Sequence, residues 1–313
     1  MATYTVVVTD QVFPDVAIET DVLRGIDAEV VSPKSASGIL PPQAATADAL
    51  LNTYLPLDRA AIGSLERCRV IARYGIGVDN IDLQAAREAG IVVTNVPDYS
   101  VEEVAVHAIT LMLALVRRLP RAMARAAEGQ WGIGALRPIP RLSELTVGVV
   151  GLGKIGTRVV ALLRPMGCRV VGFDPYVREG EGVEIVVRLD DLLGAVDVVS
   201  LHLPATPETR GMIDATALAR MRPGTLLINT SRGALVHTSD LADALRSGHL
   251  GGAALDVLER EAADASAFEG IDNVILTPHM AYYSESSLRE SQRKAATQVL
   301  KVLTGQAPDY PVT

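Results

Sequence analysis

The sequence contains little of what several protein classes require. It has two cysteines in 313 residues, Cys68 and Cys168, and neither stands in a CxxC pair. This scarcity argues against a disulfide framework or a thiolate zinc site and favours a reducing compartment. Lysine and arginine number 29 against 37 aspartates and glutamates, which gives a net charge of −8. A protein that binds nucleic acids in general would need a basic surface instead.

No segment resembles a targeting signal or a membrane anchor. Residues 1–5 lead directly into the apolar run 5–9, without the basic start and apolar core of a signal peptide. The most apolar helical stretch, Val104–Val116, has 13 residues, and a bilayer requires about 20. The sequence therefore predicts a cytoplasmic protein that binds no membrane, no nucleic acid and no metal.

The chain does contain a regular alternation of short apolar strands and helices. Aromatic residues make up 4% and hydrophobic residues 49%, so aliphatic side chains must build the cores. In the first hundred residues, strands are predicted at 4–9, 29–32, 49–54, 69–74 and 91–96, with helices at 16–24, 58–67 and 83–89. A long helix at 101–118 and a loop rich in glycine and proline at 129–140 follow.

A second series of the same kind occupies the rest of the chain. Its predicted strands are 146–150, 169–174, 183–187, 196–203, 225–229, 253–256 and 273–277, with helices such as 155–166, 238–247 and a last one at 284–304. Nearly continuous apolar strands alternating with helices indicate parallel sheets covered on both faces. We therefore expect two unequal α/β domains, each with a doubly wound parallel sheet, and a cleft between them.

A glycine-rich turn follows the predicted strand at 146–150. Gly151, Gly153 and Gly156 form a GxGxxG motif between this strand and a helix. Such a turn allows backbone N–H groups and the helix N-terminus to bind a pyrophosphate. Asp174 ends the next strand, 18 residues after Gly156, where a carboxylate accepts hydrogen bonds from the ribose hydroxyls of NAD. No arginine follows directly to bind the 2′-phosphate of NADP, so NAD is the predicted cofactor.

Five histidines are candidates for acid–base chemistry, and their positions separate them. His279 follows the strand at 273–277 and Pro278, at the carboxyl end where open α/β sheets bind ligands. His202 also lies at a strand end but has no evident partner. His107 lies within the apolar helix and is expected to pack at an interface. His237 begins a helix, where a capping role is expected, and His249 lies in a turn.

Charged residues follow two further predicted strands. Arg232 comes directly after the strand at 225–229, and a guanidinium can bind a carboxylate through two parallel hydrogen bonds. Asp256 ends the strand at 253–256. Glu259 and Glu261 follow it in a charged run, and spacing alone does not distinguish them.

Several blocks together resemble the D-isomer-specific 2-hydroxyacid dehydrogenases, over nearly the whole chain. The matching blocks are residues 73–82, 151–156, 229–233, 253–257 and 277–279. The resemblance implies a smaller, flavodoxin-like substrate domain made from both chain ends, 1–99 and 285–313. It further implies an NAD-binding Rossmann domain at 100–284 and a homodimer formed through the helix at 101–118.

The resemblance also assigns roles to individual residues. It implies that Arg232, Glu261 and His279 are catalytic and that Asp256 contacts the nicotinamide amide. Backbone N–H groups of Gly75, Ile76 and Gly77 are expected to bind the substrate carboxylate. The remaining expected cofactor contacts are Lys154, Ile155, Leu203, Pro204, Thr230 and Ser231, and the tyrosines expected to line the substrate side are Tyr54, Tyr74 and Tyr282.

The implied activity is NAD-dependent reduction of a 2-oxo acid to a D-2-hydroxy acid, or the reverse. Segments 97–103 and 278–285 look like the C-terminal binding protein branch, so an NAD(H)-sensing scaffold is the alternative. Phosphoglycerate dehydrogenases are the other near relatives. Their phosphate-binding arginines would fall within residues 52–54, which contain no arginine. The chain departs from the C-terminal binding protein branch at Tyr282, where tryptophan is usual. It departs from the family at His237 and Ala262, where aspartate and proline are usual.

Overall fold

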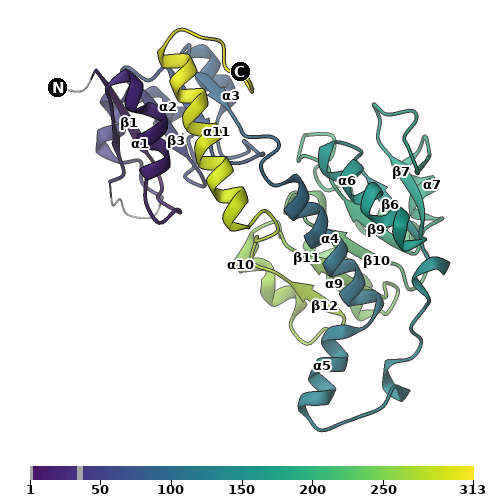
Figure 1. Ribbon diagram of the computed structural model, residues 1–313. Helices are drawn as coiled ribbons and strands as arrows, with labels where there is room; N and C mark the ends of the chain where they lie inside the picture. The colour runs from purple at the N-terminus through teal and green to yellow at the C-terminus, as the bar shows by residue number, and fades with distance from the viewer. Residues whose placement is uncertain (1–2, 34–37) are drawn as a thin grey trace. The chain divides into compact units, whose positions relative to one another are not determined.

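The computed structural model describes residues 3–33 and 38–313. The chain divides into two compact units, Met1–Tyr99 with Ser284–Thr313 and Ser100–Tyr283. Each unit is a parallel β-sheet with helices (Figure 1). The predicted fold class, two α/β domains with parallel sheets, is confirmed.

The first unit contains a five-stranded parallel sheet in the order β2-β1-β3-β4-β5, which is the flavodoxin-like order. The strands are β1 (Tyr4–Val8), β2 (Ala28–Val31), β3 (Ala49–Asn52), β4 (Val70–Arg73) and β5 (Val92–Thr94). Its helices are α1 (Ala17–Leu23), α2 (Arg59–Gly63), α3 (Leu83–Glu88) and α11 (Glu285–Leu303). The central strand β3 is fully buried, because helices cover both faces of a parallel sheet.

The two chain ends meet in this unit, because α11 packs against α1 and β4 (Figure 1). A buried polar cluster joins these elements. Glu19 on α1 accepts hydrogen bonds from the Tyr74 hydroxyl, at 2.7 Å, and from Gln292 Nε2 on α11, at 3.1 Å. Burial and the neighbouring Glu19 carboxylate raise the pKa of Tyr74 well above its ordinary value.

The second unit contains a seven-stranded parallel sheet in the order β12-β11-β10-β9-β6-β7-β8. The strands are β6 (Thr146–Val150), β7 (Arg169–Phe173), β8 (Glu184–Ile185), β9 (Val198–Leu201), β10 (Leu226–Asn229), β11 (Gly252–Leu255) and β12 (Val274–Leu276). Its helices are α4 (Val101–Val116), α5 (Leu119–Ala127), α6 (Lys154–Leu163), α7 (Leu189–Leu193), α8 (Ala215–Arg220), α9 (Thr238–Arg246) and α10 (Glu261–Asp264). The strand order reverses between β6 and β9, and ligands bind at such a reversal, outside the carboxyl ends of the strands.

Helix α4 packs against α6, β10 and β11 and buries most of its apolar side chains in the core. It ends at Val116, two residues before the predicted end. Arg118 then adopts φ 51°, and α5 begins with Pro120 in its first turn. The sequence predicts a helix at 101–118 and a loop at 129–140, and α5 between them was not predicted. Proline is well tolerated in a first helical turn, because its missing N–H has no partner there in any helix.

Most of the remaining predicted elements are present with shorter bounds. Strand β8 keeps two residues of the predicted run 183–187, and β9 begins two residues later than predicted. The loop at 129–140 contains one 3-10 turn, Gly134–Leu136, and Trp131 is exposed there. Among the helices of residues 3–33 and 38–313, none is both long and apolar enough to cross a membrane.

Candidate active site

The glycine-rich turn connects β6 to α6 and leaves space where a ligand would need it. Gly151 adopts φ 94°, and a Cβ there would lie 2.5 Å from the carbonyl oxygen of His202. A Cβ at Gly156 would lie 1.9 Å from the carbonyl oxygen of Gly151. A Cβ at Gly153, by contrast, would meet no atom of the described chain within 4 Å. Packing therefore requires glycine at the first and third positions, and the space over Gly153 suits a diphosphate.

Asp174 fixes this turn from the neighbouring strand. Its Oδ2 accepts a hydrogen bond from the Leu152 N–H at 2.9 Å, and its Oδ1 accepts one from the Tyr176 N–H at 2.9 Å. A carboxylate has about four acceptor positions. Asp174 can therefore hold the turn and still accept hydrogen bonds from ribose hydroxyls.

His202 supports the turn from the other side. Its backbone N–H donates to the Val150 carbonyl oxygen at 2.7 Å, and its ring Nε2 lies 2.8 Å from Ser200 Oγ. Burial lowers the pKa of His202 to about 4, so the ring is neutral at physiological pH. Ser200 is the partner that the sequence did not reveal. Leu203 packs against Gly151, and Pro204 is exposed.

The loops after β10 and β11 lie against each other. A Cβ at Gly233 would lie 1.9 Å from the carbonyl oxygen of Leu258. The buried Asn229 side chain organises the first of these loops: its Oδ1 accepts hydrogen bonds from the N–H and hydroxyl of Ser231, and its Nδ2 donates to the Arg232 carbonyl oxygen at 2.9 Å. Arg232 Nη1 donates to the Ser231 carbonyl oxygen at 2.7 Å. Thr230 Oγ1 is buried and has no hydrogen-bond partner among the described residues.

The structure separates Glu259 and Glu261, which spacing alone left open and between which the family resemblance favoured Glu261. Glu261 Oε1 lies 2.6 Å from His279 Nδ1. Glu259 Oε2 instead accepts the Thr238 N–H at 2.8 Å, at the start of α9. It thereby provides the cap hydrogen bond that the His237 side chain does not form. Glu261 and His279 have φ of 32° and 51°, values that are strained for residues with a Cβ and that often mark functional sites.

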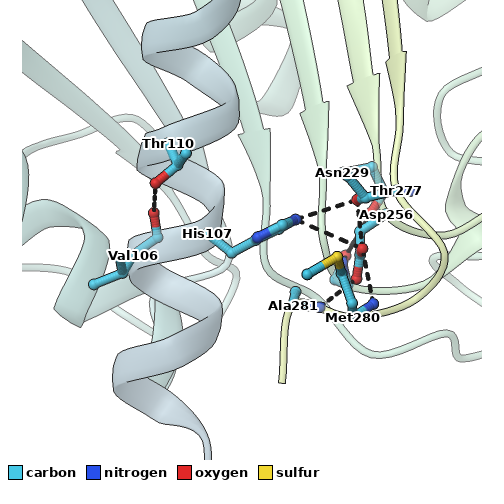
Figure 2. Close-up of polar contacts among 9 residues, drawn as sticks. Val106, His107, Thr110, Asn229, Asp256, Thr277, Met280 and Ala281 are labelled. Carbon is cyan, nitrogen blue, oxygen red and sulfur yellow. Dashed lines mark hydrogen bonds and ion pairs between the residues drawn. The ribbon is translucent and has the colours of Figure 1, made fainter. Parts of the chain in front are cut away.

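Asp256 is buried at the carboxyl end of β11, beside Thr277, Met280 and Ala281 (Figure 2). Its carboxylate accepts hydrogen bonds from the Thr277 hydroxyl and from the N–H groups of Met280 and Ala281, at 2.5, 3.0 and 2.9 Å. His107 reaches the same group from α4. His107 was expected to pack at an interface, and this contact with the Asp256 cluster was not predicted, although one histidine on an apolar helix was the available signal.

The residues expected on the substrate side differ in their exposure. Tyr54 is exposed, and the Tyr282 ring packs edge-on to His279 with centroids 6.2 Å apart. The Tyr74 ring does not line a surface as expected: it is buried against Phe13, and its hydroxyl binds Glu19. In the loop that follows, the carbonyl oxygens of Gly75 and Ile76 accept hydrogen bonds from the Val96 N–H and from Asn95 Nδ2.

The second unit matches a known family. Residues 109–281 match the model described as "D-isomer specific 2-hydroxyacid dehydrogenase, NAD binding domain". The chain belongs to the D-isomer-specific 2-hydroxyacid dehydrogenase family. The predicted family and NAD as its cofactor are confirmed, and the open turn at Gly153 with Asp174 beside it fits that cofactor.

Individual members of the dehydrogenase family resemble the chain over most of its length. D-3-phosphoglycerate dehydrogenase of Methanocaldococcus jannaschii is 38% identical over 82% of this chain and 49% of that protein. C-terminal-binding protein 1 of Caenorhabditis elegans is 34% identical over 83% of this chain and 38% of that protein. The chain thus spans about half the length of the first of these relatives, and less of the second. The crystal structure of D-lactate dehydrogenase from Aquifex aeolicus with NAD and lactic acid has a TM-score of 0.90, 30% identity and 98% coverage of both chains.

Proposed function

We propose that the protein is an NAD-dependent dehydrogenase that reduces a 2-oxo acid to the D-2-hydroxy acid, or catalyses the reverse reaction. The observation that carries this proposal is the 2.6 Å contact between Glu261 Oε1 and His279 Nδ1. The pair belongs to the NAD-binding unit, and Arg232 follows a neighbouring strand of the same sheet. An acid–base pair and a carboxylate-binding cation are the groups that this reaction requires.

In the proposed mechanism, NADH supplies the hydride when it is bound. Reduction develops negative charge on the carbonyl oxygen of the substrate. His279 holds one proton on Nδ1, facing Glu261, and donates a second from Nε2 to that oxygen. The Glu261 carboxylate stabilises the imidazolium before the transfer. In the oxidation direction, His279 takes the proton back as a base.

Arg232 binds the substrate carboxylate and polarises the adjacent carbonyl. The buried Asn229 amide forms hydrogen bonds with the Arg232 carbonyl oxygen and with Ser231. The Arg232 side chain therefore extends from an ordered backbone. Backbone N–H groups of Gly75, Ile76 and Gly77 are proposed as further carboxylate donors. Tyr74 contributes no ring to this site, since its side chain is buried.

The proposed cofactor contacts follow the same reasoning. Gly151, Gly153 and Gly156 with the start of α6 would bind the diphosphate, and Asp174 would bind the ribose hydroxyls. Asp256 Oδ2 accepts one hydrogen bond, from the Ala281 N–H. Its second lone pair can accept a hydrogen bond from the nicotinamide amide. The remaining proposed contacts are Lys154, Ile155, Leu203, Pro204, Thr230 and Ser231.

We propose that the preferred substrate has an uncharged or aromatic side group. Residues 52–54 contain no cationic side chain that would bind a phosphate. Tyr54 is exposed, and the Tyr282 ring packs beside His279. This proposal separates the chain from relatives named D-3-phosphoglycerate dehydrogenase. A cytoplasmic location and a homodimer stay predictions.

An NAD(H)-sensing scaffold is the second candidate, and the similarity to C-terminal-binding protein 1 favours it. A scaffold has no need of a complete set of Arg232, Glu261 and His279. The contact between Glu261 and His279 therefore weighs toward an enzyme.

The test is a panel of 2-oxo acids, each assayed by NADH oxidation. It includes pyruvate, 4-methyl-2-oxopentanoate, phenylpyruvate, glyoxylate and 3-phosphohydroxypyruvate. Turnover of at least one acid, lowered about 10²–10⁴-fold by His279→Ala, supports the proposal. His249→Leu is the matched control, because His249 lies away from these loops and contacts the Leu218 carbonyl oxygen. NADH binding without turnover of any acid would favour the scaffold, and a strong preference for 3-phosphohydroxypyruvate would contradict the pocket argument.

A further inference from the structure

His107 lies on α4, a helix that the proposed mechanism does not use, and it contacts the turn that carries His279. His107 lies in the middle of α4, and its Nε2 lies 3.2 Å from Thr277 Oγ1 and 3.6 Å from Asp256 Oδ1. Figure 2 shows the ring extending from the helix toward the ends of β11 and β12. Because α4 packs into the core of this unit, its backbone is a fixed support for the ring.

The hydrogen-bond partners determine which atom carries each proton. A carboxylate only accepts hydrogen bonds, so the single Thr277 hydroxyl proton points to Asp256 Oδ1, 2.5 Å away. Thr277 Oγ1 then has lone pairs left and accepts from His107. His107 therefore carries a proton on Nε2, and that N–H also faces Asp256 Oδ1. The result is a chain of contacts from α4 through Thr277 to a buried carboxylate.

Asp256 in turn holds the backbone of His279 and of the two residues that follow it, and the Thr277 side chain that precedes it. Its backbone carbonyl oxygen accepts the His279 N–H at 2.9 Å, and its carboxylate accepts the next two N–H groups. The turn from 277 to 281 thus wraps around one side chain. His279 adopts φ 51° within it, a conformation that persists only when surrounding contacts enforce it.

We propose that His107 is a positioning residue for His279, acting through Thr277 and the Asp256 carboxylate. This inference rests on the proposed function, in which His279 exchanges the proton with the substrate. His107 and Thr277 together restrain Asp256 Oδ1, so the carboxylate keeps one orientation and the turn around it keeps its shape. Oδ2, which they do not contact, remains available to a ligand.

The test compares variants that remove or keep each hydrogen bond. His107→Leu removes the donor, and His107→Gln retains an N–H near the position of Nε2. Thr277→Val removes the hydroxyl at nearly constant shape, and Thr277→Ser retains it. The measurements are kcat and KM with the panel acid of highest kcat/KM, and the dissociation constant of NADH from fluorescence titration.

We expect His107→Leu and Thr277→Val to lower kcat about tenfold to a hundredfold, because a small displacement of a reacting group has that effect. KM and the NADH dissociation constant should change by less than about threefold. His107→Gln and Thr277→Ser should recover most of the lost kcat. His249→Leu again serves as the control and should leave kcat unchanged.

Three results would overturn the inference. One is unchanged kcat in both His107→Leu and Thr277→Val. Another is an equal loss in the conservative and the disruptive variants, which would indicate a packing role. The third is a loss confined to NADH affinity, which would assign the cluster to the cofactor. Failure of the proposed function is distinguishable, because His279→Ala would then retain full turnover. If His107→Leu does not fold, the inference is tested by comparing kcat of Thr277→Val with kcat of Thr277→Ser.

Discussion

Glu261 and Glu259 have the same side chain, two residues apart, yet they occupy different environments. Glu261 contacts His279, and Glu259 caps α9. A difference of two positions in a loop changes which way a side chain points, and here it determines which carboxylate can support an acid–base histidine. The two residues therefore form a natural pair for mutagenesis.

The first prediction uses this pair. Glu261→Gln should lower kcat about tenfold or more, because a neutral amide no longer stabilises the imidazolium that donates the proton. Glu259→Gln should leave kcat unchanged, since an amide oxygen can still accept the Thr238 N–H. Steady-state kinetics on both variants test this, and equal losses would contradict the assignment of Glu261.

The second prediction concerns Asp174 and cofactor choice. The wild-type protein should have a much higher kcat/KM with NADH than with NADPH, because the carboxylate repels a 2′-phosphate. Asp174→Asn should raise the NADPH/NADH ratio of kcat/KM. Its amide oxygen can still accept the Leu152 N–H, so the turn should persist. Equal wild-type values with both cofactors would refute this account.

The third prediction is a pH dependence of stability that arises from His202. Its pKa in the folded protein is lowered to about 4 by burial, from an ordinary value near 6.5. The unfolded chain therefore binds a proton at a higher pH than the folded protein does. The stabilisation is present above pH 6.5 and is lost as pH falls from there toward 4.

The size of the loss in stability follows from the shift in the pKa of His202. Between pH 7 and pH 4.5, His202 should remove about 2 kcal/mol of the free energy of unfolding. His202→Gln does not titrate in this range, so its free energy of unfolding should fall less over the same interval. Urea denaturation of both proteins at the two pH values measures the difference, and parallel pH dependences would count against a buried neutral imidazole.

At the scale of elements, Glu19 joins α1, α11 and the residue that follows β4. It is fully buried, and it accepts hydrogen bonds from Tyr74 and Gln292. A buried carboxylate depends on each of its donors, because no water replaces a lost one. This cluster therefore holds the C-terminal helix to the N-terminal part of the chain.

The fourth prediction tests that cluster. Tyr74→Phe should lower the free energy of unfolding by about 1–3 kcal/mol, since Glu19 loses a donor while the packing against Phe13 remains. Tyr310→Phe is the matched control, because its hydroxyl makes a longer contact, 3.4 Å from Asp98. Tyr310→Phe should lower the free energy of unfolding by less than Tyr74→Phe does. Denaturant titration compares the two, and losses of equal size would argue against a special role for Glu19.

At the scale of the whole molecule, the surface of α4 and α5 carries apolar side chains. Val106, Leu119 and Met123 are exposed, and α5 has no buried residue. An apolar surface of this kind often marks a protein–protein contact. It supports the expectation of a homodimer formed through the region of α4.

The fifth prediction follows from that surface. Light scattering at micromolar concentration should give the mass of a dimer. Met123→Glu should shift the equilibrium toward the monomer, because it places a charge on the apolar surface. Val187→Glu, at an exposed apolar residue in a different part of the same unit, should not. A monomeric wild-type protein would refute the assembly.

The sequence by itself determined most of the elements, the presence of two parallel sheets and the glycine turn, because these follow from local periodicity and short motifs. Strand and helix signals act over a few residues, and GxGxxG with Asp174 lies within one βαβ unit. Helix α5 was missed because a proline can follow the end of one helix or stand in the first turn of the next. Here the chain breaks at Arg118, which has a positive φ, and Pro120 belongs to the second helix.

Only the tertiary structure decided which polar side chains meet. His107 and Thr277 are separated by 170 residues, and no motif connects them. For Glu261 and His279, 18 residues apart, the family resemblance implied one site, and the structure adds their contact. The Tyr74 ring was expected beside the substrate and is instead buried on Glu19, 55 residues away. Contacts of this kind depend on how strands are ordered in a sheet and on which helix face packs against it. Side-chain direction at a strand end is set by those packing partners, and no local pattern in the sequence records them.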